Sequence, residues 1–225
     1  MSTIDPTQLH RPAQKSLRIT LAVIFLTIAG SIAFGWIRWK RWDAEWKAIG
    51  PCEASGGLYQ QPRLELKVPI FRQSDPRWGK DKLGDTEASL GAEGCAVASA
   101  AMVLSAFGFD TDPGRLNQYL AENDGYEGKG WIKWEKAAEL TEGKFEKAYE
   151  DLPSFWLIDN NLRGGNPVIA KLKSPDGTHF VVICGKDGYD YLTCDPGTAE
   201  GRGVYPLKQY GSKIEGIRFY RRVAN

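Results

Sequence analysis

Two residues of this chain have the types and surroundings needed for nucleophilic catalysis, Cys95 and His179. The chain holds two histidines, and because His10 precedes a long apolar segment, a catalytic histidine would have to be His179. His179 begins an apolar run directly after a turn, and the end of a strand can present a base to solvent. Cys95 follows Gly94 and opens an alanine-rich segment that predicts a helix. The pair therefore predicts a thiol activated by an imidazole.

The position of Cys95 favours its thiolate. A cysteine at the start of a helix faces unpaired backbone N–H groups and the positive end of the helix dipole, and both stabilise negative charge. The small side chains of residues 96–101 would let a sheet carrying the histidine approach closely. A thiolate beside an imidazole performs acyl transfer through a thioester, with the imidazole as acid and base.

Asp195 is the candidate for a third catalytic residue. Lys186-Asp187-Gly188 suits a three-residue hairpin loop, and counting back from this loop places Asp195 across from His179. A carboxylate there would orient the imidazole and stabilise the imidazolium. A register shift of one residue would put the two side chains on opposite faces of the sheet. Asp-Pro-Gly is also an ordinary turn sequence, which is the alternative interpretation.

Four segments occur in the order seen in one group of enzymes: Gln73-Ser74-Asp75-Pro76-Arg77-Trp78-Gly79, Gly94-Cys95-Ala96-Val97, Gly177-Thr178-His179-Phe180-Val181-Val182 and Asp195-Pro196-Gly197. Together they resemble papain-like cysteine peptidases, in particular the bacterial branch related to the leader-peptidase domains of bacteriocin-exporting transporters (cysteine peptidase family thirty-nine). The resemblance covers about residues 67–200. It implies a papain-like α+β fold, a peptide or protein substrate and no cofactor. It also implies that Gln73 donates a hydrogen bond to the oxyanion, beside the backbone N–H of Cys95.

Each of these residues also has a structural interpretation. A single buried cysteine is usually an inert small hydrophobe, His179 alone could be a core histidine, and Gln73 could cap a loop. The same fold also serves acyltransferases and amidases, and a peptide-binding module without turnover is the alternative outside enzymes. Charge is balanced, with 29 Lys and Arg against 28 Asp and Glu. The sequence contains no phosphate loop, metal-ligand cluster or basic aromatic strip, so we expect no nucleic-acid partner, metal or cofactor.

The other three cysteines are predicted to be structural. No pair has C-x-x-C spacing, and four cysteines in 225 residues do not make a disulfide scaffold. In the register used for Asp195, the α-carbons of Cys184 and Cys194 lie beyond the roughly 7 Å limit for a disulfide. We therefore expect both to pack in the core, while Cys52 lies in a linker.

The predicted elements place helices first and an antiparallel sheet second, which indicates an α+β fold. The alanine-rich helix runs from Cys95 to Phe107 and ends at Gly108. Further helices are predicted after Asp112, around Trp131 and Trp134, and over 154–163. The predicted strands are Val168–Leu172, His179–Cys184, Tyr189–Cys194, Val204–Pro206 and Gly216–Tyr220.

Residues 19–37 contain no charged side chain and are long enough, at about 28 Å, to cross a bilayer as a helix. Trp36, Trp39 and Trp42 alternate with cations at the far end, as at a membrane interface. A cleaved signal peptide is the alternative, although the apolar run is longer than usual for one. We therefore expect a single-pass protein of the cell membrane. Three cations precede the span and four follow it, which leaves the side of the enzyme open.

The expected organisation has four parts. An N-terminal tail (1–18) precedes the transmembrane anchor (19–37), a juxtamembrane linker rich in glycine and proline (38–66) follows, and a papain-like catalytic domain occupies 67–225. A domain of this size can bury its own core. The oligomeric state is left open by the sequence.

Overall fold

The computed structural model describes residues 11–128, 130–175, 177–199 and 201–223. The chain divides into two compact units, Met1–Glu45 and Trp46–Asn225. Helix α1 (Arg11–Lys47) makes up the described part of the first unit, and its last two residues belong to the second. Within the described residues, one helical segment, Ser16–Lys47, is long enough and apolar enough to cross a membrane. It contains the predicted span 19–37. The first ten residues of the predicted tail, with His10, lie outside the described residues.

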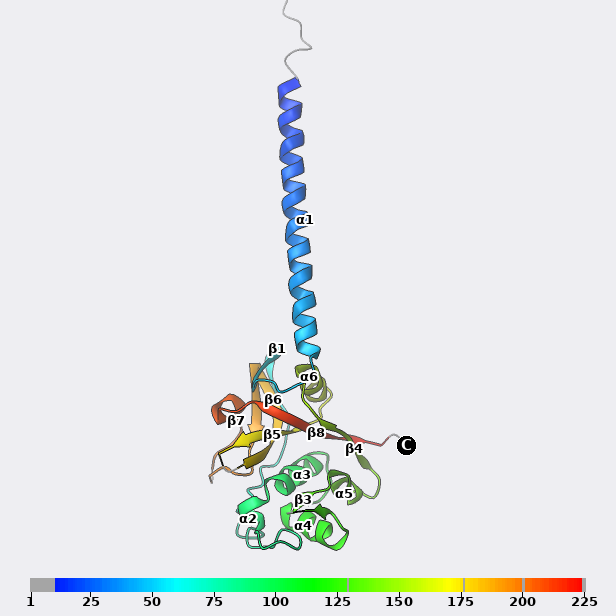
Figure 1. Ribbon diagram of the computed structural model, residues 1–225, viewed down its shortest axis with the longest axis vertical. Coiled ribbons are helices and arrows are strands. Elements are labelled where there is room, and N and C mark those ends of the chain that lie inside the picture. Colours follow the sequence, from blue (N-terminus) through cyan, green and yellow to red (C-terminus); the bar gives the residue numbers. More distant parts are fainter. Residues whose placement is uncertain (1–10, 129, 176, 200, 224–225) are drawn as a thin grey trace, which may run out of the picture. The chain divides into compact units, whose positions relative to one another are not determined.

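The second unit is built on a six-stranded sheet whose strands all pair antiparallel (Figure 1). The order along the sheet is β1-β6-β5-β8-β4, and β7 pairs with β6. The strands are β1 (Ser55–Glu65), β4 (Phe145–Asp151), β5 (Val168–Ser174), β6 (Gly177–Cys194), β7 (Tyr205–Pro206) and β8 (Ile214–Arg222).

Helices cover both faces of this sheet. The elements are α2 (Leu90–Glu93), α3 (Cys95–Ala106), α4 (Pro113–Glu122), α5 (Trp134–Glu139), α6 (Phe155–Arg163), the 3₁₀ helix η2 (Leu207–Tyr210) and a small second sheet of β2 (Tyr126–Glu127) and β3 (Trp131–Ile132). Alternate residues of β6 point to opposite cores, so Val182 packs with α3, α4 and α5 while Val181 packs with α6. Helices α2 to α5 gather on one side of the sheet in Figure 1.

The predicted helix starts are confirmed by their caps. Helix α3 begins at Cys95. Helix α4 follows Asp112, whose carboxylate accepts a hydrogen bond from Arg115 N, and α6 follows Ser154, whose hydroxyl accepts one from Leu157 N. The α+β fold class is confirmed as well. The predicted helix around Trp131 is wrong for that residue, because Trp131 lies in β3 and the helix begins at Trp134.

The expectation of a linker over 38–66 is wrong. Helix α1 continues to Lys47, and residues 55–65 form β1, which pairs with the middle of β6. The glycines that suggested a linker allow close backbone approach instead. Gly57 has φ 67°, and a Cβ there would lie 2.9 Å from the Tyr191 hydroxyl. The compact unit therefore begins at Trp46 rather than at Lys67.

The two strands predicted over 179–184 and 189–194 belong to one element, β6, whose halves contact each other. The Thr193 hydroxyl donates to the carbonyl of Val182 at 3.1 Å, and the Cys184 thiol contacts the carbonyl of Leu192 at 3.6 Å. This return of the chain brings the residues after Cys194 back toward the start of β6. Of the turn predicted before His179, residue 176 lies outside the described residues.

Candidate active site

Cys95 is the first residue of α3 and is buried, with 9% of its surface exposed. The short helix α2 precedes it, and the two helices meet at Gly94. A Cβ at Gly94 would overlap the carbonyl and side chain of Leu90, so only glycine allows this junction. The thiol thus occupies the helix N-terminus that the sequence predicts.

His179 lies near the start of β6, opposite Leu172 of β5. Its Nε2 hydrogen-bonds with Oδ1 of Asp195 at 2.7 Å, and its ring lies close enough to the Cys95 thiol to interact with it electrostatically. With Nε2 directed to the carboxylate, Nδ1 is left for the thiol. The structure therefore brings together the three residues selected as nucleophile, base and orienting acid.

The imidazole of His179 favours its protonated form. Burial lowers its pKa, but the hydrogen bond to Asp195, the interaction with the Cys95 thiol and the charges of both exceed that effect and raise the pKa of His179 to about 9. The imidazole therefore carries a positive charge at neutral pH.

Asp195 receives three hydrogen bonds. Its Oδ1 accepts from His179 Nε2 and from the backbone N–H of Gly197 at 2.8 Å, and its Oδ2 accepts from the Tyr205 hydroxyl at 2.6 Å. Burial alone would raise its pKa, but the donors from His179 and Tyr205 outweigh burial and hold the pKa of Asp195 below its usual value. Asp195 is thus a buried carboxylate with a fixed orientation.

Gln73 lies between the loop that carries Asp195 and the helix before Cys95. Its backbone N–H donates to the carbonyl of Pro196 at 3.0 Å, and its side-chain Nε2 donates to the carbonyls of Gly91 and Ala92 at 3.0 and 3.2 Å. Its Oε1 is buried and has no hydrogen-bond partner among the described residues. Both amide hydrogens are directed at α2, so donation to an oxyanion requires one of these bonds to be exchanged.

Sequence reasoning missed three residues around the histidine. Tyr205 bonds Asp195, and the ring of Tyr210 stacks on that of His179 with centroids 5.5 Å apart and planes 11° from parallel. Gly197 packs so closely that a Cβ there would lie 3.0 Å from Cε1 of His179. The tyrosines have no motif or spacing that could have revealed them. Gly197 was part of a recognised motif, although its closeness to the ring was not foreseen.

Cys184 and Cys194 lie in the same part of the core, and each is fully buried. All four cysteines are free, and the Cys184 thiol donates to the carbonyl of Leu192. The neighbouring Cys194 thiol and burial raise the pKa of Cys184. Both side chains pack in the core on the α3 side of the sheet, because the two halves of β6 lie side by side there. Both residues do pack in the core, as predicted.

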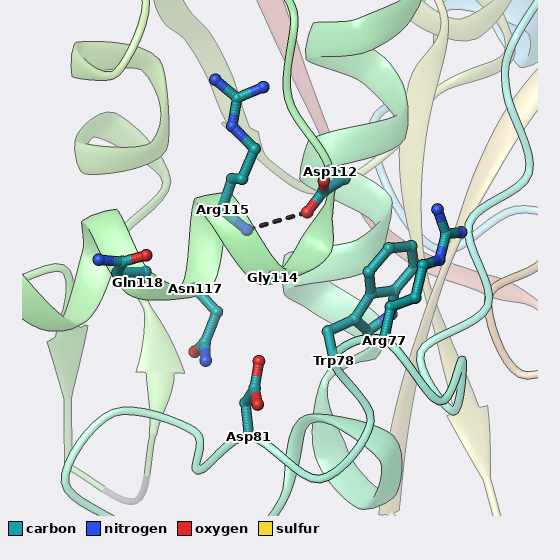
Figure 2. A pocket seen from close by; sticks show the side chains of 8 residues that line it. All are labelled: Arg77, Trp78, Asp81, Asp112, Gly114, Arg115, Asn117 and Gln118. Atoms are coloured by element: carbon teal, nitrogen blue, oxygen red, sulfur yellow. Dashed lines mark hydrogen bonds between the residues drawn. The ribbon is translucent and has the colours of Figure 1, made fainter.

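A separate open hollow of about 500 Å³ lies over the start of α4 (Figure 2). It is lined by Arg77, Trp78, Asp81, Asp112, Gly114, Arg115, Asn117 and Gln118. Its two arginines are paired with Asp75 and Asp110, and Asp112 caps α4. None of the four predicted site residues lines this hollow. Within the described ranges no three potential metal ligands come together.

Comparison with known proteins gives the family. The sequence profile of the Peptidase C39-like family matches residues 65–221. The chain belongs to the peptidase C39-like family. This confirms the family that the four motifs predicted and makes the chain a relative of cysteine peptidases. No curated protein matches the sequence.

Two solved structures are similar to this C39-like chain. One is described as a C39-like peptidase from Bacillus anthracis, with 17% identity, a TM-score of 0.46, and coverage of 73% of this chain and 100% of that one. The other is a double glycine motif protease from an AMS/PCAT transporter in complex with the leader peptide, with 19% identity, a TM-score of 0.43, and coverage of 78% and 100%.

Proposed function

We propose that this C39-like protein is a membrane-anchored thiol peptidase in which Cys95 is the nucleophile, His179 the acid and base, and Asp195 the residue that orients His179. The observation that carries the proposal is the position of the His179 imidazole, which hydrogen-bonds with Asp195 and interacts electrostatically with the Cys95 thiol. A core histidine would need only one polar partner. Here the imidazole has a thiol on one side and a buried carboxylate on the other.

The proposed reaction is acyl transfer through a thioester. The Cys95 thiolate attacks the peptide carbonyl, and the tetrahedral intermediate collapses as His179 gives its proton to the leaving amine. The neutral imidazole then takes a proton from water, whose oxygen attacks the thioester. Collapse of the second intermediate releases the acid and returns the thiolate and the imidazolium.

The oxyanion would be stabilised by the backbone N–H of Cys95 and by Gln73. Loss of one such donor costs about 2.7–4 kcal/mol of barrier in enzymes of this type. In this role the side-chain amide of Gln73 would give up its hydrogen bond to the Ala92 carbonyl, the longer of its two, when substrate binds.

The substrate class is a peptide or protein segment, which follows from family membership and from the nucleophile. Residues 19–37 of α1 would anchor the enzyme in the lipid bilayer as a single span. This part of the proposal rests on the length and apolar character of the helix.

Alkylation of the full chain in detergent with iodoacetamide tests the nucleophile, with each cysteine followed by mass spectrometry. Cys95 should react quickly at pH 6, and His179→Ala should remove this rate because the imidazolium is lost. Cys52 is an internal control, because burial raises its pKa to about 12 and keeps it as a thiol. If Cys95 reacts no faster than Cys52, the chain is better explained as a peptide-binding module.

Turnover of a peptide library by the same protein tests the reaction. Cys95→Ala and His179→Ala should each lower hydrolysis by at least about 10³-fold, and Asp195→Asn should lower it less than either. Wild-type turnover in Cys95→Ala would remove Cys95 as the nucleophile. Adding an amine acceptor and following amide formation separates a peptidase from an acyltransferase.

A further inference from the structure

The segment from β7 to the end of η2 supplies two tyrosines to the proposed catalytic pair. Strand β7 pairs with the end of β6 so that Tyr205 lies opposite Thr193, two residues before Asp195. This register directs the buried Tyr205 hydroxyl to Oδ2 of Asp195 at 2.6 Å. The guanidinium of Arg202 covers the outer face of the Tyr205 ring at 3.6 Å from its centroid, which limits its movement.

Tyr210 reaches the site from the end of η2. Gly211, with φ 80°, ends this helix and its N–H bonds the carbonyl of Lys208. The Tyr210 ring lies nearly parallel to the imidazole of His179, 5.5 Å away between centroids. Such offset stacking resists tilting of either ring.

The contacts of Tyr205 and Tyr210 restrict motions that the hydrogen bonds of Asp195 with His179 and Gly197 leave free. With His179 and Gly197 both on Oδ1, the carboxylate of Asp195 could still turn about its last bond, and the bond from Tyr205 to Oδ2 prevents that turn. The imidazole could still swing about its bond to Asp195. Contact with a flat ring on its face prevents that motion.

We infer that Tyr205 and Tyr210 are positioning residues of the proposed reaction, Tyr205 through its hydroxyl on Asp195 and Tyr210 through its ring on His179. This inference rests on the proposed function, since neither tyrosine is expected to touch the substrate. Because one acts by its hydroxyl and the other by its ring, replacement by phenylalanine separates their roles.

Tyr205→Phe should lower kcat about 10- to 100-fold with KM unchanged, the range expected for loss of a hydrogen bond to a charged group. Removing this donor also lets the pKa of Asp195 rise, so the acid limb of the pH profile should move to higher pH. Tyr210→Phe should keep wild-type kcat because the stacked ring remains. Tyr210→Leu should lower kcat about 10-fold and leave the acid limb in place.

Tyr126→Phe is the matched control for Tyr205→Phe. The Tyr126 hydroxyl donates at the same distance, 2.6 Å, to the neutral amide of Asn117 in another part of the unit. Both variants should lose some thermal stability, but Tyr126→Phe should keep wild-type kcat and pH profile. Equal losses of kcat in the two variants would reduce Tyr205 to a stability role and overturn the inference.

Alkylation of Cys95 in the full chain in detergent separates failure of this inference from failure of the proposed function. If wild-type Cys95 reacts no faster than in His179→Ala, the proposed function fails. If wild-type Cys95 reacts faster than in His179→Ala but Tyr205→Phe keeps the wild-type kcat and acid limb, only the inference fails.

Equal losses of kcat in Tyr210→Phe and Tyr210→Leu would likewise overturn the role of the Tyr210 ring. In an Asp195→Asn background, Tyr205→Phe should have no further effect, because Tyr205 acts through Asp195.

Discussion

His179 is held by four neighbours that come from distant parts of the chain. Asp195 hydrogen-bonds with its Nε2, the Cys95 thiol interacts with its ring electrostatically, Tyr210 stacks on it and Gly197 packs at its edge. The imidazole is therefore restricted in position and in charge. Two consequences at the scale of single residues can be measured.

The first is a pH dependence of hydrolysis. The pKa of His179 in the folded chain is about 9, above the ordinary 6.5, so the imidazolium that protonates the leaving amine is present below pH 9 and lost above it. We expect kcat/KM to fall as pH rises through about 9, whereas alkylation of Cys95, which needs only the thiolate, should not fall. The imidazolium also contributes stability that is fully present below about pH 6.5 and lost as pH rises through 9. A basic limb near 6.5 would contradict this ion pair.

The second is the effect of a methyl group at Gly197. In Gly197→Ala the new Cβ would lie 3.0 Å from Cε1 of His179 and 3.3 Å from Oδ1 of Asp195, so one of them must shift. A shift of this kind should lower kcat about 10-fold or more. Gly203→Ala is the control, because a Cβ there would have no neighbour within 4 Å. Peptide hydrolysis at saturating substrate gives the comparison, and equal activity in both variants would contradict the predicted crowding.

At the scale of elements, Asp159 joins α6 to three other parts of the unit. Its carboxylate accepts hydrogen bonds from Trp46 Nε1 at the end of α1, Leu58 N in β1, and both Lys186 Nζ and the Tyr191 hydroxyl in β6. Asp159 and Lys186 are fully buried. These bonds attach the edge strand β1 and the start of the unit to the middle of the sheet.

Removing this carboxylate should destabilise the fold without changing the chemistry. Asp159→Ala leaves the ammonium of Lys186 buried and unpaired, which costs about 3–5 kcal/mol of unfolding free energy. The double variant Asp159→Leu with Lys186→Met should lose less, since no charge remains buried. Denaturant unfolding of the full chain in detergent measures both. A double variant less stable than Asp159→Ala would contradict the role assigned to the pair, and kcat per folded molecule should stay at the wild-type value.

At the scale of the whole molecule, the boundary of the compact unit has a practical consequence. A chain of residues 46–225 keeps β1 and the contacts of Asp159, whereas a chain of residues 67–225 loses β1 and exposes the β6 edge. We expect the first to be soluble, monodisperse and active by size-exclusion chromatography and peptide turnover. The second should aggregate or unfold at lower temperature. Equal melting temperatures would show that β1 contributes little.

The local features of the fold were predictable because they depend on neighbouring residues. The cap at Asp112, the helix from Cys95 and the strand after Pro167 follow from short-range patterns, and these predictions are confirmed. Strand β1 was not predicted. Its glycines pack against Phe155, Asp159 and Tyr191, which lie far from them in the sequence, so short-range patterns do not reveal the strand.

The sequence by itself determined the family, the α+β class and the choice of Cys95, His179, Asp195 and Gln73. Motif order and residue chemistry are properties of the chain, and elimination left a single histidine near the cysteine. Only the tertiary structure decided what surrounds that histidine. The bond of Tyr205 to Asp195, the stacking of Tyr210 and the engagement of both Gln73 amide hydrogens by α2 depend on strand register and loop path. These arise from long-range packing, which short patterns along the chain do not encode.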